Sequence, residues 1–260
     1  MDSLPLIASS IMSKKLAAGA KSIVLDVKVG SGAFLKNEAE GRMLAKQMVA
    51  IGKACGRNVT AILTNMDVPL GYHVGNALEV IEAVEVLKGR GSSDLREICV
   101  ALASNLVSMC RGISLEDAEE KVLQSIDSGM AMNVMRTWIR AQGGNAEALD
   151  DYSLLPQAKV QYELRSPTDG YIRSMDTRLV GQSSAILGAG RAKKEDNVDH
   201  AAGIVLKKKT GDYVHAGETL AVLHTNKPQS IEDAQKSLLQ CYEWSDAERG
   251  EEKLIYGIVK

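Results

Sequence analysis

The chain has 260 residues, 45% of them hydrophobic, so it is long enough to bury a core and to form two domains. Its 31 Lys and Arg nearly balance its 33 Asp and Glu, which argues against recruitment of nucleic acid or of an anionic membrane by net charge. No apolar run approaches the roughly 18 residues that span a bilayer, and no basic flank leads into an apolar leader, so the sequence predicts a cytoplasmic protein.

In chain order, the first clear element is a helix over residues 4–18, because Asp2 or Ser3 can cap it, Pro5 fits its first turn and Gly19 suits its end. A buried strand over 22–27, a helix over 37–54 and a strand over 59–63 follow, and this order predicts a parallel α/β unit. Further helices are predicted over residues 76–87, 94–109, 115–126 and 130–140.

The helical pattern lapses between residues 143 and 157, and we place a domain boundary there, between residues 1–150 and 151–260. Beyond it, short alternating runs separated by glycine turns predict a β-rich α+β domain. Its segment 210–220 closely resembles the hairpin of lipoyl and biotinyl folds. One amphipathic helix is predicted over 227–243, with a stripe of apolar residues facing the core: Ile231, Ala234, Leu238 and Cys241.

Three other compositional features point to no special chemistry. The four cysteines are widely spaced without a CxxC pair, so we expect reduced, mostly buried thiols rather than a zinc site or a redox motif. The basic run Lys207–Lys209 is short, and we expect it to be the solvated flank of a turn. The four histidines form no ligand motif and no catalytic triad.

A candidate polar clamp lies on the first helix. Ser10 and Lys14 are four residues apart and Ile7 is three before Ser10, so all three project from one face. A hydroxyl, an ammonium and an aliphatic side chain together suit the carbonyl-rich edge of a pyrimidine ring. The competing interpretation is that Ser10 and Lys14 are simply solvated, as such residues on helices usually are.

Two loops are further candidates. Residues 28–34 leave the carboxyl end of a strand, where open α/β sheets place ligands, but they lack the spacing of a dinucleotide fingerprint or a P-loop. A binding loop and a structural tight turn remain alternatives, and Phe34 either contacts a flat base or plugs the core. Residues 67–82 form a loop that enters a helix. The carbonyls of the loop and one carboxylate are ligands that a hard cation takes, but the same spacing also fits an ordinary capped helix.

Taken together, the segments 2–15, 26–34 and 69–79 resemble the thymidine and pyrimidine-nucleoside phosphorylase family in order and spacing. The tail motifs resemble that family's C-terminal domain: Met175–Arg178, Gly188–Arg191 and Gly211–Asp212. The resemblance covers essentially the whole chain. It implies an α/β fold: the remainder of a helical lobe with a partial α/β core over 1–150, followed by a lipoyl-like (hammerhead) domain over 151–260.

The resemblance also implies roles for the clamp. Ser10 and Lys14 match the family's contacts to the pyrimidine, Ile7 and Phe34 match the apolar lining of its base pocket, and Lys14 would be the catalytic residue. The family reaction is reversible phosphorolysis of a pyrimidine nucleoside, with phosphate as co-substrate and no organic cofactor. An ammonium and a hydroxyl near the base would stabilise the charge that builds up as it departs.

A cation site is implied as well. The family's monovalent cation, usually potassium, is held by two main-chain carbonyls and a glutamate that match Leu70, His73 and Glu82. His73 stands where the family commonly has a small residue. Because the ligand there is the backbone oxygen, the site need not be lost.

Parts of the family pattern are not found in these residues. The glycine-rich phosphate-binding segment, an arginine that contacts the base and the helices of the family's homodimer contact all lie upstream of the matched motifs. We therefore expect this chain alone to be inactive or nearly so. Two alternatives are a non-catalytic assembly or binding module and a related phosphoribosyltransferase. A carrier module would need a modifiable lysine at a hairpin tip and a phosphoribosyltransferase a diphosphate-binding glycine loop, and neither is found.

Overall fold

A computed structural model describes residues 3–191, 193–250 and 252–260, which form two compact units. Unit 1 comprises Met1–Met66, Asp94–Ser125 and Lys253–Lys260, and unit 2 comprises Asp67–Ser93 and Ile126–Glu252. The two units interleave along the chain, so they divide it differently from the predicted split at residues 150 and 151. That split remains a prediction about the order of the domains.

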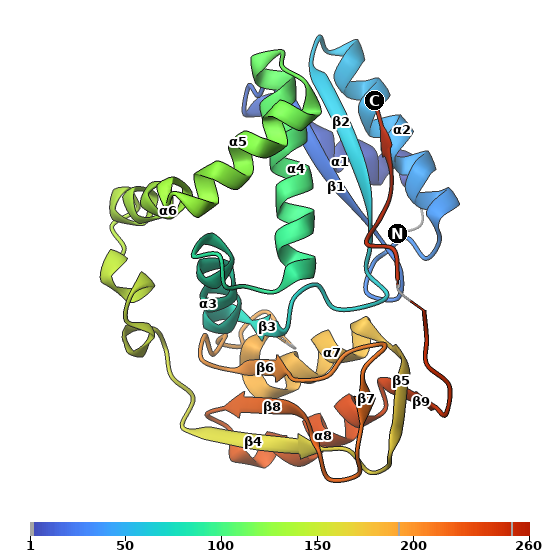
Figure 1. The fold of residues 1–260 in the computed structure, drawn as a ribbon, viewed down its shortest axis with the longest axis vertical. Helices are drawn as coiled ribbons and strands as arrows, with labels where there is room; N and C mark the ends of the chain where they lie inside the picture. The colour runs from blue at the N-terminus through green and yellow to red at the C-terminus, as the bar shows by residue number, and fades with distance from the viewer. Residues whose placement is uncertain (1–2, 192, 251) are drawn as a thin grey trace. The chain divides into compact units, whose positions relative to one another are not determined.

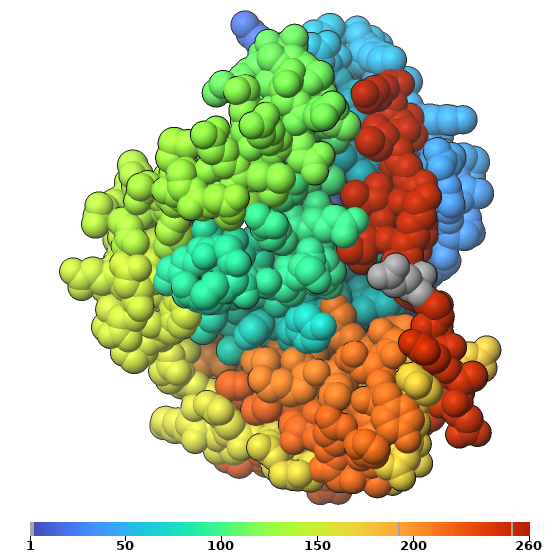
Figure 2. Space-filling view, in the orientation of Figure 1, coloured from blue at the N-terminus to red at the C-terminus, as the bar shows by residue number. Residues whose placement is uncertain are grey.

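Unit 1 is built on a parallel pair of strands, as predicted. Strand β1 (Ser22–Val29) pairs in parallel with β2 (Asn58–Asn65), and α2 (Glu38–Ala54) makes the crossover between them (Figure 1). Strand β10 (Ile255–Val259) joins the far side of β2 in antiparallel orientation. This C-terminal segment is red in Figure 2, where it lies along the surface of the unit. Chain segments nearly 200 residues apart in the sequence therefore share one small sheet.

The first helix is anchored in the core of unit 1. Helix α1 (Leu4–Ala17) has Pro5 in its first turn, and Gly19 follows it with a left-handed φ of +78°. Ser3 occupies the cap position without a side-chain cap bond, and Asp2 lies outside the described residues. Ala8 and Met12 are fully buried and pack with residues of β1, α2 and β2. One face of α1 is thereby held, and the opposite face remains at the surface.

The remaining helices follow the predictions to within two residues at each end. They are α3 (Asn76–Leu87), α4 (Ser93–Arg111), α5 (Leu115–Asp127) and α6 (Met130–Ala141). Within the described residues, no single helix is long and apolar enough to cross a membrane; the pair α4 and α5 passes on length and composition together but is bent by 119°.

Unit 2 carries two antiparallel sheets around one core. The first has the order β3–β6–β8–β4, and the second has the order β7–β5–β9. Their strands are β3 (His73–Gly75), β4 (Val160–Arg165), β5 (Gly170–Met175), β6 (Gly203–Leu206), β7 (Tyr213–Val214), β8 (Thr219–Thr225) and β9 (Tyr242–Ser245). Leu164, Ile172 and Leu223 come from both sheets and share a buried cluster with α7 (Thr177–Ser184). This β-rich α+β arrangement agrees with the prediction.

The predicted helix over 227–243 is too long. The α-helix α8 spans only Ile231–Leu239, after a short 3-10 turn at Pro228–Ser230, and β9 begins at Tyr242. Aromatic residues favour a pleated, half-buried strand, and Tyr242 pairs there with Met175 of β5. The prediction of an inward stripe is confirmed, because Ala234, Leu238 and Cys241 are buried.

The expectation of mostly buried thiols is wrong. Cys241 is buried, whereas the other three cysteines are exposed: Cys55 directly after α2, and Cys99 and Cys110 on α4. All four are free thiols. Helical periodicity identified Cys241 correctly because it extends the apolar stripe of α8, but the others lie off the apolar faces of their helices.

Candidate functional site

The predicted clamp residues lie on α1 in unit 1. The Ser10 and Lys14 side chains are exposed one helical turn apart, and the Ser10 carbonyl accepts a hydrogen bond from Ser13 Oγ at 3.2 Å. Ile7 is half-buried and packs against the core of the unit. The Ser10 hydroxyl and the Lys14 ammonium are therefore accessible to a ligand, while one side of the Ile7 side chain packs against the core.

The loop after β1 is a tight turn whose amide groups are already used. Gly30 N donates to the Leu35 carbonyl at 2.9 Å, and Gly32 N donates to the Met66 carbonyl at 3.0 Å. Lys36 Nζ closes the turn from outside with bonds to two loop carbonyls. Of the two alternatives, the geometry favours a structural turn over a cradle for an anion. Phe34 projects from it with 95% of its surface exposed, so the interpretation as a core plug is wrong.

A polar group at the carboxyl ends of β1 and β2 was not singled out by sequence reasoning. Asp26 Oδ1 accepts a hydrogen bond from Thr64 Oγ1 at 2.5 Å, and Asp26 Oδ2 forms an ion pair with Lys28 Nζ at 2.7 Å. The signal was present, because both strands carry polar residues near their carboxyl ends and parallel strands bring those ends to one edge. Cys99 is exposed at the surface, but the surrounding protein partly desolvates its thiol and so raises its pKa, on which Asp26 and Lys28 act in opposite directions.

The predicted cation residues lie together in unit 2. Leu70 and His73 belong to the turn that enters β3, and Glu82 projects from α3 with only 5% of its surface exposed. The Glu82 carboxylate accepts hydrogen bonds from Tyr72 N at 2.7 Å and from His73 N at 3.2 Å. We call residues 69–73 the cation turn. The carboxylate thus lies directly against the turn whose carbonyls were predicted as ligands.

Gly71 allows the Glu82 carboxylate to lie directly against the cation turn. Its φ of +70° is left-handed, and a Cβ at this position would lie 2.3 Å from Glu82 Oε2. Gly75 and Gly203, a facing pair in β3 and β6, play a similar part, because a Cβ on Gly203 would lie 2.3 Å from the Val74 carbonyl oxygen. Glycine therefore brings the turn and its strand into direct backbone contact with their neighbours.

Glu82 is ionised in this setting. Burial alone would raise the pKa of its carboxyl, but a hydrogen bond from His73 and the backbone amides of Tyr72 and His73 lower that pKa below its ordinary 4.5. His73 Nδ1 lies 3.3 Å from Glu82 Oε1. This contact between the imidazole and the carboxylate is an ion pair only when His73 is protonated. A buried carboxylate beside main-chain carbonyls is a donor set that fits a monovalent cation.

One expectation about the basic run is wrong. Lys207 is exposed and Lys208 pairs with Glu218 at 2.7 Å, but Lys209 has only 7% of its surface exposed. Its Nζ donates hydrogen bonds to the carbonyls of Pro69 and Gly71 in the cation turn. These partners lie 140 and 138 residues away along the chain, so local sequence carried no signal of the contact.

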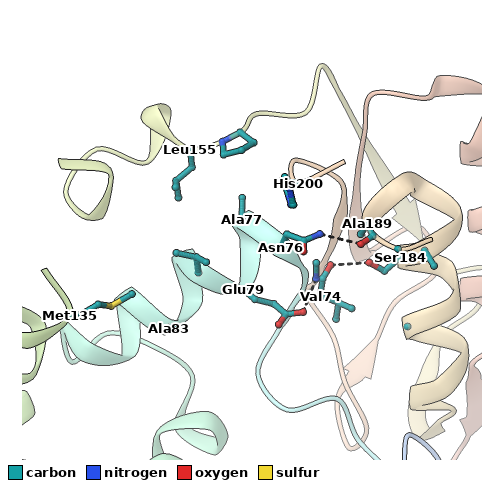
Figure 3. Close-up of a pocket in the computed structure, with 16 residues that line it drawn as sticks. Val74, Asn76, Ala77, Glu79, Ala83, Met135, Leu155, Ser184, Ala189 and His200 are labelled. Carbon is teal, nitrogen blue, oxygen red and sulfur yellow. Dashed lines mark hydrogen bonds between the residues drawn. The ribbon is translucent and has the colours of Figure 1, made fainter. Parts of the chain in front are cut away.

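A hollow of about 710 Å³ opens beside the start of α3 in unit 2 (Figure 3). Its lining is largely apolar, and two of its polar side chains are paired with the backbone. Asn76 Nδ2 donates to the Ala189 carbonyl at 3.1 Å, and Ser184 Oγ donates to the Val74 carbonyl at 3.3 Å. None of the predicted site residues lines it. This hollow therefore lies apart from the residues that the sequence predicted as a site.

Comparisons with known proteins agree with the resemblance. The family model described as glycosyl transferase family, a/b domain, matches residues 1–132, about half of the chain. The model described as pyrimidine nucleoside phosphorylase C-terminal domain matches residues 171–245. Each match falls on one side of the interval in which the domain boundary was predicted.

Individual relatives point the same way. The pyrimidine-nucleoside phosphorylase of Geobacillus stearothermophilus is 47% identical over 241 residues, which are 92% of this chain and 55% of that protein. Those of two Staphylococcus aureus strains, bovine RF122 / ET3-1 and USA300, are 47% and 46% identical over 239 residues, again 92% of this chain and 55% of each protein. The chain therefore belongs to the glycosyl transferase family. It is similar to these pyrimidine-nucleoside phosphorylases and spans about half of their length.

Proposed function

We propose that this chain provides the pyrimidine-binding and cation-binding parts of a nucleoside phosphorylase. The observation that carries the proposal is the placement of Ser10 and Lys14, exposed one turn apart on a helix that Ala8 and Met12 anchor in the core. Because the helix backbone is anchored, the hydroxyl and the ammonium extend from fixed backbone positions toward the carbonyl groups of a pyrimidine.

The proposed reaction is phosphorolysis of thymidine, uridine or deoxyuridine. An oxygen of inorganic phosphate attacks the anomeric carbon, the glycosidic C–N bond breaks, and its electron pair leaves with the base. The products are the free base, once it has taken up a proton, and a pentose 1-phosphate. Negative charge develops on the carbonyl oxygens of the departing base, where the Lys14 ammonium and the Ser10 hydroxyl would stabilise it. Lys14 is thus the proposed catalytic residue.

Ile7 and Phe34 are proposed to line the base pocket. The Phe34 ring is almost wholly exposed, which leaves both its face and its edge free to contact a flat base. The aliphatic side chain of Ile7 lies on the same helix as the clamp and is already half-buried. Apolar contact of this kind would orient the ring and exclude water from the polar clamp.

The cation turn is proposed to hold potassium through the carbonyls of Leu70 and His73 and the carboxylate of Glu82. A bound monovalent cation would supply a fixed positive charge beside the buried carboxylate. The support is the lowered pKa of Glu82, which keeps it ionised, and its position against the turn. His73 contributes a backbone oxygen, so its side chain does not bar the site.

Three wider features of the family are proposed with the reaction. We place the division of the chain near residue 150, between a partial α/β core and a tail of lipoyl-like (hammerhead) type, and the antiparallel strand pairs and glycine turns of the tail support the latter. Phosphate would be the co-substrate, and the assembled enzyme a homodimer. No organic cofactor enters the proposed chemistry.

The test is phosphate-dependent release of thymine or uracil from the matching nucleosides. The chain is assayed alone and after addition of the part of a relative's chain that lies outside the matched region. We expect little turnover alone and measurable turnover after addition. Lys14→Ala should then lower kcat/KM by about a hundredfold or more, as loss of one transition-state donor typically does.

Lys15→Ala is the matched control, because Lys15 is adjacent on the same helix but projects about 100° away. It should leave kcat/KM within about twofold. Equal activity in Lys14→Ala and Lys15→Ala would rule out Lys14 as the catalytic residue. Robust turnover by the chain alone would contradict the expectation that it needs a further part.

A further inference from the structure

Lys209 is a buried lysine in a segment that composition alone marks as solvated. It follows β6, and its backbone N donates to Asp212 Oδ2 at 2.7 Å in the tight turn before β7. A lysine at such a turn has ordinary access to solvent and normally extends its ammonium into water. Here the side chain instead points inward and is 7% exposed. Some specific interaction must compensate for the removal of its charge from water.

Main-chain oxygens of the cation turn supply part of this compensation. Lys209 Nζ donates to the Pro69 carbonyl at 2.7 Å and to the Gly71 carbonyl at 3.0 Å, and it lies 4.6 Å from the centre of the Tyr72 ring. Two carbonyl oxygens and the face of an aromatic ring are a typical environment for a desolvated cation. The ammonium therefore occupies a small cation site made of the turn itself.

Glu82 binds the amide groups of the same turn, whereas Lys209 binds its carbonyl groups. The Glu82 carboxylate accepts the amides of Tyr72 and His73, while Lys209 takes the carbonyls of Pro69 and Gly71. Four main-chain groups of the turn are thus divided between one buried anion and one buried cation. Leu70, a proposed cation ligand, lies between the two residues whose carbonyls Lys209 binds.

We propose that Lys209 is a positioning residue for the cation turn. Its ammonium serves as an internal cation that fixes residues 69–73 against Glu82, so that the turn keeps its conformation whether or not an inorganic cation is bound. This role of Lys209 in fixing the conformation of the turn does not depend on the proposed phosphorolysis. Only the consequence for potassium binding rests on the proposed function.

Hydrogen exchange at the Tyr72 and His73 amides is the measurement that tests this. Lys209→Met keeps the length and apolar volume of the side chain but removes the charge and the donors. Both amides should then exchange at least about tenfold faster than in the unsubstituted chain, while the amides of the β4–β8 ladder keep their rates. Lys207→Met, the same change at an exposed neighbour, should leave all these rates unchanged.

Lys209→Arg keeps the charge and can donate to two carbonyls, so it should keep the two amides protected to within about threefold. This variant decides the question if Lys209→Met does not fold. Equal protection in Lys209→Met and Lys207→Met would overturn the proposal. An equal acceleration of exchange in the β4–β8 ladder of Lys209→Met would also overturn it, since that would indicate general loss of packing. A folded Lys209→Arg in which the Tyr72 and His73 amides lose their protection would overturn it as well.

Potassium titration separates this proposal from the proposed cation site. In the unsubstituted chain, thermal stability should rise with potassium chloride and not with tetramethylammonium chloride, and the potassium midpoint should increase at least about tenfold in Lys209→Met. If the unsubstituted chain does not respond to potassium, the cation site is wrong, and the exchange rates still decide the role of Lys209. A response with the same midpoint in both chains would overturn the link between Lys209 and the cation ligands.

Discussion

Replacing Gly71 with alanine tests the geometry of the cation turn most directly. Gly71 has a φ of +70°, and the added Cβ would lie 2.3 Å from Oε2 and 2.7 Å from Cδ of the Glu82 carboxylate. Neither the backbone nor this buried carboxylate has space to accept a methyl group. The substitution must therefore either shift the turn or displace the carboxylate from the two amides that it holds.

The expected cost has two parts. An L-residue in the left-handed region costs roughly 1–2 kcal/mol. Weakening of the hydrogen bonds between the Glu82 carboxylate and the amides of Tyr72 and His73 adds roughly 1.5–3 kcal/mol, as is usual for bonds to a charged group. We therefore expect Gly71→Ala to lower the free energy of unfolding by about 2.5–5 kcal/mol.

The matched control is Gly89→Ala. Gly89 has a similar φ of +76° in the same unit, but a Cβ there would meet no atom within 4 Å, so its substitution isolates the backbone cost. Urea denaturation of both variants measures the difference, which should be about 2 kcal/mol. If Gly71→Ala costs no more than Gly89→Ala, the carboxylate does not lie against the turn as described.

Two further predictions concern titration and reactivity. Because the pKa of Glu82 is lower in the folded chain than its ordinary 4.5, its contribution to stability is present above that value and is lost as pH falls through the folded pKa. The unsubstituted chain should therefore lose more stability than Glu82→Gln between about pH 5 and pH 3 in urea melts, and parallel losses would contradict the assignment. Burial raises the pKa of the Cys241 thiol to about 12, so a thiol reagent at neutral pH should label the native chain at the three exposed cysteines and reach Cys241 only after unfolding. Mass spectrometry of the labelled peptides checks this, and native labelling of Cys241 at the rate of Cys55 would refute it.

Much of the helical structure could be predicted, because its signals are local. Pro5 and Gly19 bracket α1, and the Asn37 side chain caps α2 by accepting the Glu40 amide at 3.0 Å. The strand–helix–strand order likewise predicted the parallel pairing of β1 with β2, since a crossover helix leads to a parallel neighbour. The error at residues 227–243 arose where a helix passes directly into a strand that pairs with β5, a partner distant in the sequence.

The candidate site could be predicted only in part. Spacing placed Ser10 and Lys14 on one face, and the structure leaves both exposed there, although their roles remain predictions. Spacing could not decide whether Phe34 is buried, and the structure exposes it. Nor could a run of three lysines reveal which one is buried, because burial of Lys209 depends on carbonyls supplied by a separate loop.

The sequence by itself determined the family, most helices, the parallel unit and the identity of the candidate clamp. Those features depend on residue spacing over a few turns and on motifs that keep their order along the chain. Only the tertiary structure decided that β10 pairs with β2, that the Glu82 carboxylate accepts hydrogen bonds from amides of the cation turn and that Lys209 donates to its carbonyls. These contacts join segments distant in the chain, and the free energy of a buried charge depends on which polar groups the fold brings to it.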